Sequence, residues 1–245
     1  EGDTSCGEVF SAQCVLVSNA EFSTVSYNGK NIGFAYEDAD GQFLRLCGVV
    51  PDNMELPPEK QAESLFKKIS DVMESRGFKF SDTVRTWFYN RKILDWYKGF
   101  NSARTKFFED SGVFEKLVPA STGIGAANPF NSALSADLLA VKPKGGRIEI
   151  KPIESPLQSS AMSYKSSFSR AIEMKFPEYR KLLISGTASI DKDGASVHKN
   201  DCRKQIDRTM EVISAVLSSR NMGWKNITRA IAYFKNKEDM RLFEE

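Results

Sequence analysis

Two stretches of the chain decide the fold, because they are diverged copies of one another. Residues 61–89 read QAESLFKKISDVMESRGFKFSDTVRTWFY, and residues 205–233 read QIDRTMEVISAVLSSRNMGWKNITRAIAY. Aligned without gaps at an offset of 144, the two stretches share eight identical residues in 29 positions. Average composition predicts roughly two such matches, so we infer an internal repeat. The identical pairs are Gln61/Gln205, Ile69/Ile213, Ser70/Ser214, Val72/Val216, Ser75/Ser219, Arg76/Arg220, Arg85/Arg229 and Tyr89/Tyr233.

Each copy is predicted to contain a hairpin of two strands, an amphipathic helix and a further strand. The helices are predicted because apolar residues recur at spacings of three and four. A single helix and hairpin cannot bury both of their faces, whereas two stacked copies can. The expected ranges are 32–36, 44–48, 58–76 and 83–89 in the first copy, and 170–176, 182–186, 201–220 and 228–234 in the second.

The first copy continues with a second helix over 93–110, which is rich in aromatic residues, and with strands over 117–124 and 134–141. A short strand over 147–152 and a polar loop over 156–164 then lead to the second copy. By the offset of 144, the counterparts of the last two strands fall past Glu245, and we expect them there. The expected division is a first half over 1–143, a connecting segment over 144–163 and a second half over 164–245.

Charge and hydropathy argue against a nucleic-acid-binding protein and against a membrane-spanning protein. The 245 residues include 34 Lys and Arg against 32 Asp and Glu, for a formal net charge of +2. No basic run marks a nucleic-acid surface, and no apolar run approaches the ~20 residues of a membrane span. The first twenty residues lack the pattern of a signal peptide. We therefore expect a cytoplasmic protein with neither a nucleic-acid nor a membrane partner.

Cysteine and histidine content argues against metal chemistry. The chain has four cysteines, none of them in a Cys-x-x-Cys pair, and a single histidine, His198. These residues cannot be assembled into the three or four ligands of a zinc site, so no metal site is expected. His198 lies in a polar loop before a helix, and we do not expect it to be catalytic.

Several strings of residues resemble a known superfamily. The second half contains YKSSFSRA over 164–171 and ISGTASI over 184–190, and the first half contains LVPASTGIG over 117–125 and DLLAVKP over 137–143. The string SPLQ over 155–158 belongs to the same pattern. Over about residues 30–245 the chain resembles the YjgF/RidA superfamily, and it is most like the chorismatases, which are built from two RidA-like halves.

The resemblance implies an α+β fold of two tandem RidA-like, or chorismate-mutase-like, units of hairpin, helix and strand, with mixed sheets backed by helices. It implies an enzyme that needs no cofactor and releases pyruvate from the enolpyruvyl side chain of chorismate or a similar small carboxylate. The acidic residue of the family lies in the last strand of the second half, which is expected beyond Glu245. No catalytic residue is therefore named. The resemblance also leaves a homotrimer open.

Substrate-binding residues are expected where the chain matches the family strings. Chorismate has two carboxylates and a ring, and we expect guanidinium groups and hydroxyl donors to bind them. Arg104, on the aromatic helix, and Arg170 are the candidate cations, and Tyr164 is the candidate hydroxyl. Lys165 stands where the family has glycine. The end of the strand over 182–186 is expected to be a central strand end that lines the pocket, and it adds the candidates Ser185, Gly186 and Ala188.

Two other functions remain open from the sequence. The first is an imine or enamine deaminase of the RidA type, although Ser121 follows Pro119-Ala120 where those deaminases carry an arginine. The second is a catalytically inactive member that binds a small molecule. Arg85 and Arg229 occur in both copies, and we expect residues of this kind to serve the shared scaffold.

Overall fold

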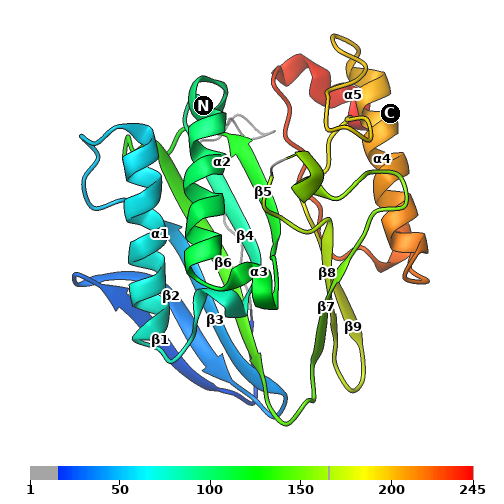
Figure 1. The fold of residues 1–245 in the computed structure, drawn as a ribbon. Helices are drawn as coiled ribbons and strands as arrows, with labels where there is room; N and C mark the ends of the chain where they lie inside the picture. The colour runs from blue at the N-terminus through cyan, green and yellow to red at the C-terminus, as the bar shows by residue number, and fades with distance from the viewer. Residues whose placement is uncertain (1–15, 165, 245) are drawn as a thin grey trace.

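A six-stranded mixed sheet forms the first half of the molecule. This computed structural model describes residues 16–164 and 166–244, so Cys6 and Cys14 lie outside it. The strand order is β1-β2-β3-β6-β4-β5, with β4 and β5 parallel and the other neighbours antiparallel (Figure 1). The strands are β1 (Glu21–Tyr27), β2 (Lys30–Glu37), β3 (Gly41–Val49), β4 (Thr83–Asn90), β5 (Ala120–Gly125) and β6 (Leu134–Pro143).

Helices α1 (Pro58–Glu74) and α2 (Ile93–Asp110) lie side by side across one face of this sheet, followed by the short α3 (Val113–Lys116). Phe66 of α1 is fully buried, and its ring lies 5.7 Å from Phe88 of β4 and 6.4 Å from Phe100 of α2. Burial of such rings is the main stabilising term of a core of this type. The aromatic residues that single out α2 in the sequence therefore attach it to α1 and to the sheet.

A three-stranded antiparallel sheet begins the second half. Its order is β7 (Glu149–Ile153), β8 (Ala171–Lys175) and β9 (Arg180–Ile184), and α4 (Cys202–Ser218) packs on it through Val216 (Figure 1). Helices α1 and α4 both have 17 residues. They begin at residues 58 and 202, which is the offset of 144 found in the sequence. The predicted α+β class, with mixed sheets backed by helices, is confirmed.

The second sheet packs against the face of the first sheet that points away from α1 and α2. Phe43 and Val141 of the first sheet share a buried cluster with Ile172 and Met174 of β8. A stack of aromatic rings crosses the same boundary. Its centroid distances are 4.5 Å for Tyr36–Phe43, 6.4 Å for Phe43–Phe176 and 4.4 Å for Phe176–Tyr179.

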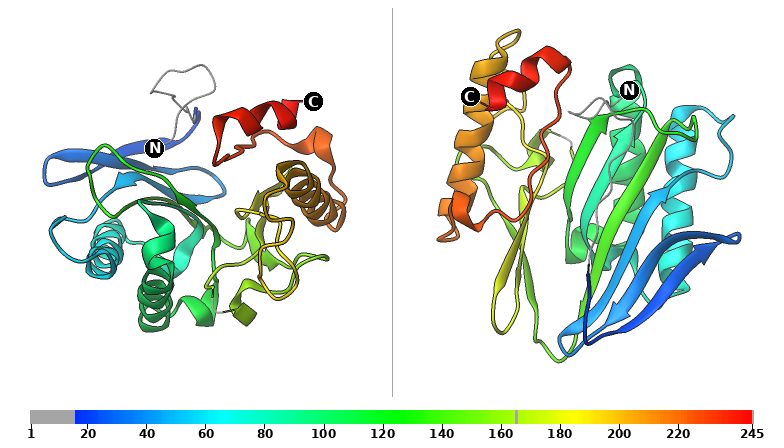
Figure 2. Two further views of the ribbon diagram at one scale, coloured as in Figure 1. Left: turned by 90° about the horizontal axis from the view of Figure 1, so that it is seen from above. Right: turned by 180° about the vertical axis from the view of Figure 1, so that it is seen from behind.

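The predicted strand over 228–234 is wrong. This stretch has an extended path but no ladder partner, and it runs between the short turn Trp224–Asn226 and α5 (Arg241–Glu244). The equivalent strand β4 is held by β5 and β6 on its two sides. In the described residues, the stretch 228–234 has no such neighbour, so its backbone lacks the hydrogen-bonding partners that define a strand. Figure 2 shows the stretch on the side of the first sheet that faces away from α1 and α2.

A second expectation also needs correction. The strand over 182–186 was expected to be central, but β9 lies at the edge of its sheet and ends at Ile184. In the described ranges, no helix is both long and apolar enough to cross a membrane.

A buried carboxylate on the second sheet binds an arginine that follows α4. Glu173 of β8 is 1% exposed, and it accepts hydrogen bonds from Nε and Nη2 of Arg220 at 2.7 and 2.8 Å. Lys151 and Arg180 lie 3.6 and 3.7 Å away. The hydrogen bonds from Arg220 hold the pKa of Glu173 below its ordinary value of 4.5. The ionised carboxylate therefore stabilises the fold above that value, and the contribution is lost as the pH falls.

We predict that Glu173→Gln lowers the free energy of unfolding at pH 7 by about 2–4 kcal/mol, because it removes a buried charge that Arg220 binds at two points. Urea denaturation measures the change, and Glu178→Gln, at an exposed position of the turn between β8 and β9, serves as the control. Below pH 4.5 the wild type should lose stability more steeply than Glu173→Gln. Equal stabilities of the two proteins at pH 7 and along the acid limb would contradict this role.

Candidate functional site

Arg104 is a buried cation on the inner side of α2. Its side chain is 3% exposed, and Nη2 donates a hydrogen bond to Oδ1 of Asn101 at 2.7 Å. The guanidinium carbon lies 5.1 Å from the centre of the Phe100 ring and 6.0 Å from that of Phe168. The helix places Arg104 four residues after Phe100, so that both residues share the face directed at the sheet.

Arg170 approaches the same phenylalanine from the second half. It is 6% exposed, and Nε and Nη2 both donate to the carbonyl oxygen of Ser159, at 3.0 and 2.7 Å. Its guanidinium carbon lies 5.5 Å from the centre of the Phe168 ring. The structure thus brings together two arginines that the sequence predicted separately, since both contact Phe168.

Hydroxyl groups surround this arginine pair. Thr105, next to Arg104 on α2, lies 2.7 Å from Ser167 through the two Oγ atoms. Ser166 and Ser167 are both buried. Guanidinium groups, aromatic rings and hydroxyls are the group types that proteins use to bind carboxylates and rings.

Ser185 and Gly186 join the two sheets, and the Ser185 N–H donates to the backbone carbonyl of Arg170 at 2.9 Å. The Ser121 N–H of β5 donates to Oγ of Ser185 at 2.9 Å, and the Gly186 N–H donates to the carbonyl of Ser121, also at 2.9 Å. Oγ of Ser185 in turn donates to the carbonyl of Ser169. A Cβ on Gly186 would lie 3.1 Å from Cγ2 of Thr122, so glycine permits the close approach of the two chains.

The remaining predicted residues are placed differently. Ala188 is exposed, and its carbonyl accepts a hydrogen bond from Nε2 of Gln158 at 3.2 Å, away from the arginine pair. Tyr164 ends the short turn Ala161–Tyr164, but its side chain and the whole of Lys165 lie outside what the structure describes. The predicted hydroxyl of Tyr164 therefore stays a prediction.

The sequence analysis missed Phe168, Thr105 and Ser167. Phe168 lies two residues before Arg170 in the string over 164–171, and this spacing was the available signal for a shared environment. Ser121, which follows Pro119-Ala120, is buried, and its Oγ accepts a hydrogen bond from Thr86 at 2.8 Å. This position therefore offers no cation to a carboxylate, which weakens the deaminase alternative for the first half.

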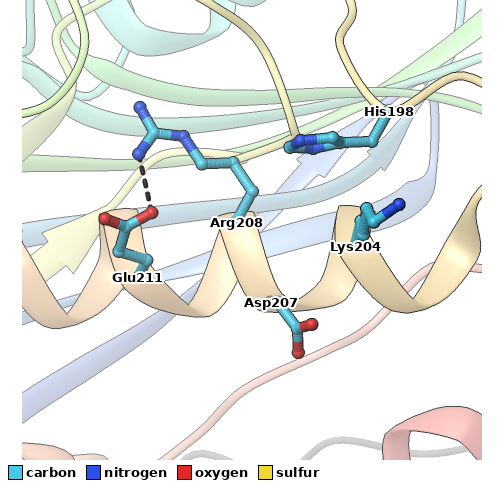
Figure 3. A pocket seen from close by; sticks show the side chains of 5 residues that line it. All are labelled: His198, Lys204, Asp207, Arg208 and Glu211. Carbon is cyan, nitrogen blue, oxygen red and sulfur yellow. Dashed lines mark hydrogen bonds and ion pairs between the residues drawn. The ribbon is translucent and has the colours of Figure 1, made fainter.

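A second, shallow pocket lies over α4 (Figure 3). His198 is exposed there and has a left-handed backbone with φ of 56°, and its Nδ1 lies 3.0 Å from Oγ of Ser189. Arg208 pairs with Glu211 at 2.7 Å, whereas Asp207 points away from both. The carbonyl of His198 accepts from Gln205, so the residue shapes the loop before α4. Across residues 16–164 and 166–244, no group of three metal-binding side chains is found.

The chain is similar in sequence and fold to known chorismatases. Residues 23–140 match the family of N-terminal domains described as chorismatase, FkbO/Hyg5-like. A chorismatase of Streptomyces hygroscopicus is 26% identical over 216 residues, which cover 82% of this chain and 59% of that protein. A chorismatase of Streptomyces rapamycinicus is 25% identical over 202 residues, covering 72% and 58% respectively. The chain thus spans somewhat less than 60% of the length of these relatives.

A solved chorismatase structure has a similar fold. It superimposes with a TM-score of 0.60 at 23% identity, over 77% of this chain and 57% of that one. The resemblance found in the sequence is confirmed by these matches. Residues 23–140 therefore match the FkbO/Hyg5-like chorismatase N-terminal family, and the chain is similar to chorismatases over most of its length.

Proposed function

We propose that this chain binds chorismate at the junction of its two halves, as part of an enzyme that releases pyruvate from the enolpyruvyl side chain. The observation that carries the proposal is the pairing of Arg104 and Arg170 around Phe168. Each half supplies one arginine, so the site exists only where the halves meet.

The chemistry of the substrate matches these groups. Chorismate has one carboxylate on its ring and another on its enolpyruvyl side chain. Each guanidinium group can donate two parallel hydrogen bonds to one carboxylate, and burial strengthens such charge-assisted contacts. The Phe168 ring offers an apolar surface to the ring of the substrate, and Thr105 and Ser167 supply hydroxyls.

The proposed reaction starts with proton transfer to the methylene carbon of the enol ether. Addition of water then gives pyruvate and a dihydroxylated cyclohexadiene acid. Alternatively, rearrangement of the ring gives pyruvate and a hydroxybenzoate with no net uptake of water. In this proposal the two arginines hold the carboxylates in place, and no residue is assigned as the proton donor. Such a reaction requires no cofactor.

The direct test is to incubate the full-length protein with chorismate and to measure pyruvate with a coupled lactate dehydrogenase assay. We expect pyruvate in stoichiometric amount, together with either a diene acid or a hydroxybenzoate as the co-product. Chromatography of the co-product distinguishes the two reactions. Pyruvate release that does not exceed the rate without enzyme would contradict the proposed activity.

Substrate binding is tested separately from turnover. We predict that Arg104→Gln and Arg170→Gln each weaken chorismate binding by about 30- to 1000-fold, because loss of a buried charge-assisted contact costs about 2–4 kcal/mol. Isothermal titration measures the dissociation constants, and circular dichroism confirms that each variant folds. Lys106→Gln, two residues along α2 and 75% exposed, is the matched control and should bind as the wild type does.

Arginine-to-lysine variants distinguish the loss of a contact with the substrate from a purely structural effect of the substitution. Arg104→Lys and Arg170→Lys keep the charge but lose the two-point geometry, and each should bind with an affinity between those of the wild type and the glutamine variant. Folded glutamine variants that bind chorismate with wild-type affinity would show that the substrate lies elsewhere.

A further inference from the structure

The repeated arginines and tyrosines of the two copies meet on the far face of the first sheet. Arg85 and Tyr89 lie on β4, and their repeat counterparts Arg229 and Tyr233 lie on the extended stretch that crosses this face. The hydroxyls of Tyr89 and Tyr233 interact, and Arg85 is within electrostatic range of both Arg229 and Tyr233. Arg85 and Arg229, which we expected to serve the shared scaffold, therefore lie in one cluster with the two tyrosines.

Arg85 is the buried centre of this cluster. It is 5% exposed, and its guanidinium carbon lies 4.5 Å from the centre of the Trp87 ring, while that of Arg45 lies 4.7 Å from the same ring. Arg85 donates to the carbonyl of Thr86 at 2.8 Å and to the hydroxyl of Thr122. Both acceptors are neutral, so they do not balance the charge of Arg85.

Positive charge is in excess around Arg85. The cations are Arg45, Arg85, Arg229 and Lys181, and the carboxylate of Asp137 interacts with Arg45 and Arg229. None of the four cations forms an ion pair within 4.0 Å in those ranges. Asp137 accepts the Gly48 N–H at 2.7 Å, and one carboxylate cannot balance four cations.

The surroundings of Arg85 are electrostatically unfavourable for its positive charge. The pKa of Arg85 is lowered to about 9, chiefly by its burial; Tyr233 and Tyr89 oppose the change, whereas Arg229 and Arg45 add to it. A buried cation without an anionic partner is unfavourable, and the usual solution is a bound anion or a paired carboxylate.

We propose that Arg45, Arg85 and Arg229 form a binding site for a small oxyanion, a phosphate or a carboxylate. Guanidinium groups bind both kinds of anion through paired oxygens, and the hydroxyls of Tyr89 and Tyr233 add donors. The exposed Arg229 closes the site from the side of the extended stretch.

This anion site is separate from the proposed chorismate site. Successive residues of a strand point to opposite faces, and on β5 Ser121 contacts Thr86 whereas Thr122 contacts Arg85. The arginine pair lies on the side of α2, and the anion site lies on the opposite side of the sheet.

The test is a titration with inorganic phosphate, and in parallel with malonate, against sodium chloride at constant ionic strength. Tryptophan fluorescence follows binding, because the guanidinium groups of Arg45 and Arg85 both lie against the Trp87 ring, and the thermal midpoint of unfolding provides a second readout. We expect a saturable response to at least one of the two anions. Arg229→Gln should weaken that response at least tenfold, because Arg229 is exposed and its loss should leave the fold intact.

Two variants make the result specific. Lys60→Gln removes the same charge from the exposed side of α1 and should leave the affinity unchanged. Trp87→Phe should abolish the fluorescence change while the anion still raises the midpoint. Responses to phosphate and malonate that equal the response to chloride, or an unchanged affinity in folded Arg229→Gln, would overturn the proposal. A response to only one anion would identify which of the two the site takes.

Discussion

The hydrogen bonds between Ser121 and the Ser185–Gly186 pair are the constraint on which the rest of the structure depends. They join the outer strand of the first sheet to the chain that leaves β9, and glycine allows the two backbones to come this close. Because this junction fixes the second half beside α2, it also fixes Arg170 near Arg104. The residues that we expected to line the pocket therefore have an observed role in holding the halves together.

Two clusters of arginines lie on opposite faces of the first sheet near β5. On the side of α2, two arginines share Phe168; on the other side, Arg85 and Arg45 share Trp87. Both arrangements place guanidinium groups against an aromatic face, which compensates in part for the loss of hydration. A chain with a net charge of only +2 can thus concentrate positive charge at two internal places.

The sequence predicted the local elements well and the contacts between them less well. Helical spacing and the repeat gave α1, α2 and α4 to within a few residues, because these patterns reflect local burial. The strand over 228–234 failed because a strand needs hydrogen-bonded neighbours, which no local pattern contains. Arg104 and Arg170 were each predicted, but their meeting at Phe168 depends on how the halves pack. Arg85 and Arg229 were assigned to the scaffold because repetition alone does not reveal that two copies of a residue converge.

The central claim is that the junction of the two halves binds chorismate between Arg104 and Arg170. The most direct measurement is a crystal structure of this chain with chorismate bound. The account predicts one carboxylate of the ligand in two-point contact with each guanidinium group, and its ring against Phe168. A ligand bound in the shallow pocket of His198 and Arg208, or on the opposite face near Arg45, with the arginine pair unoccupied, would contradict it.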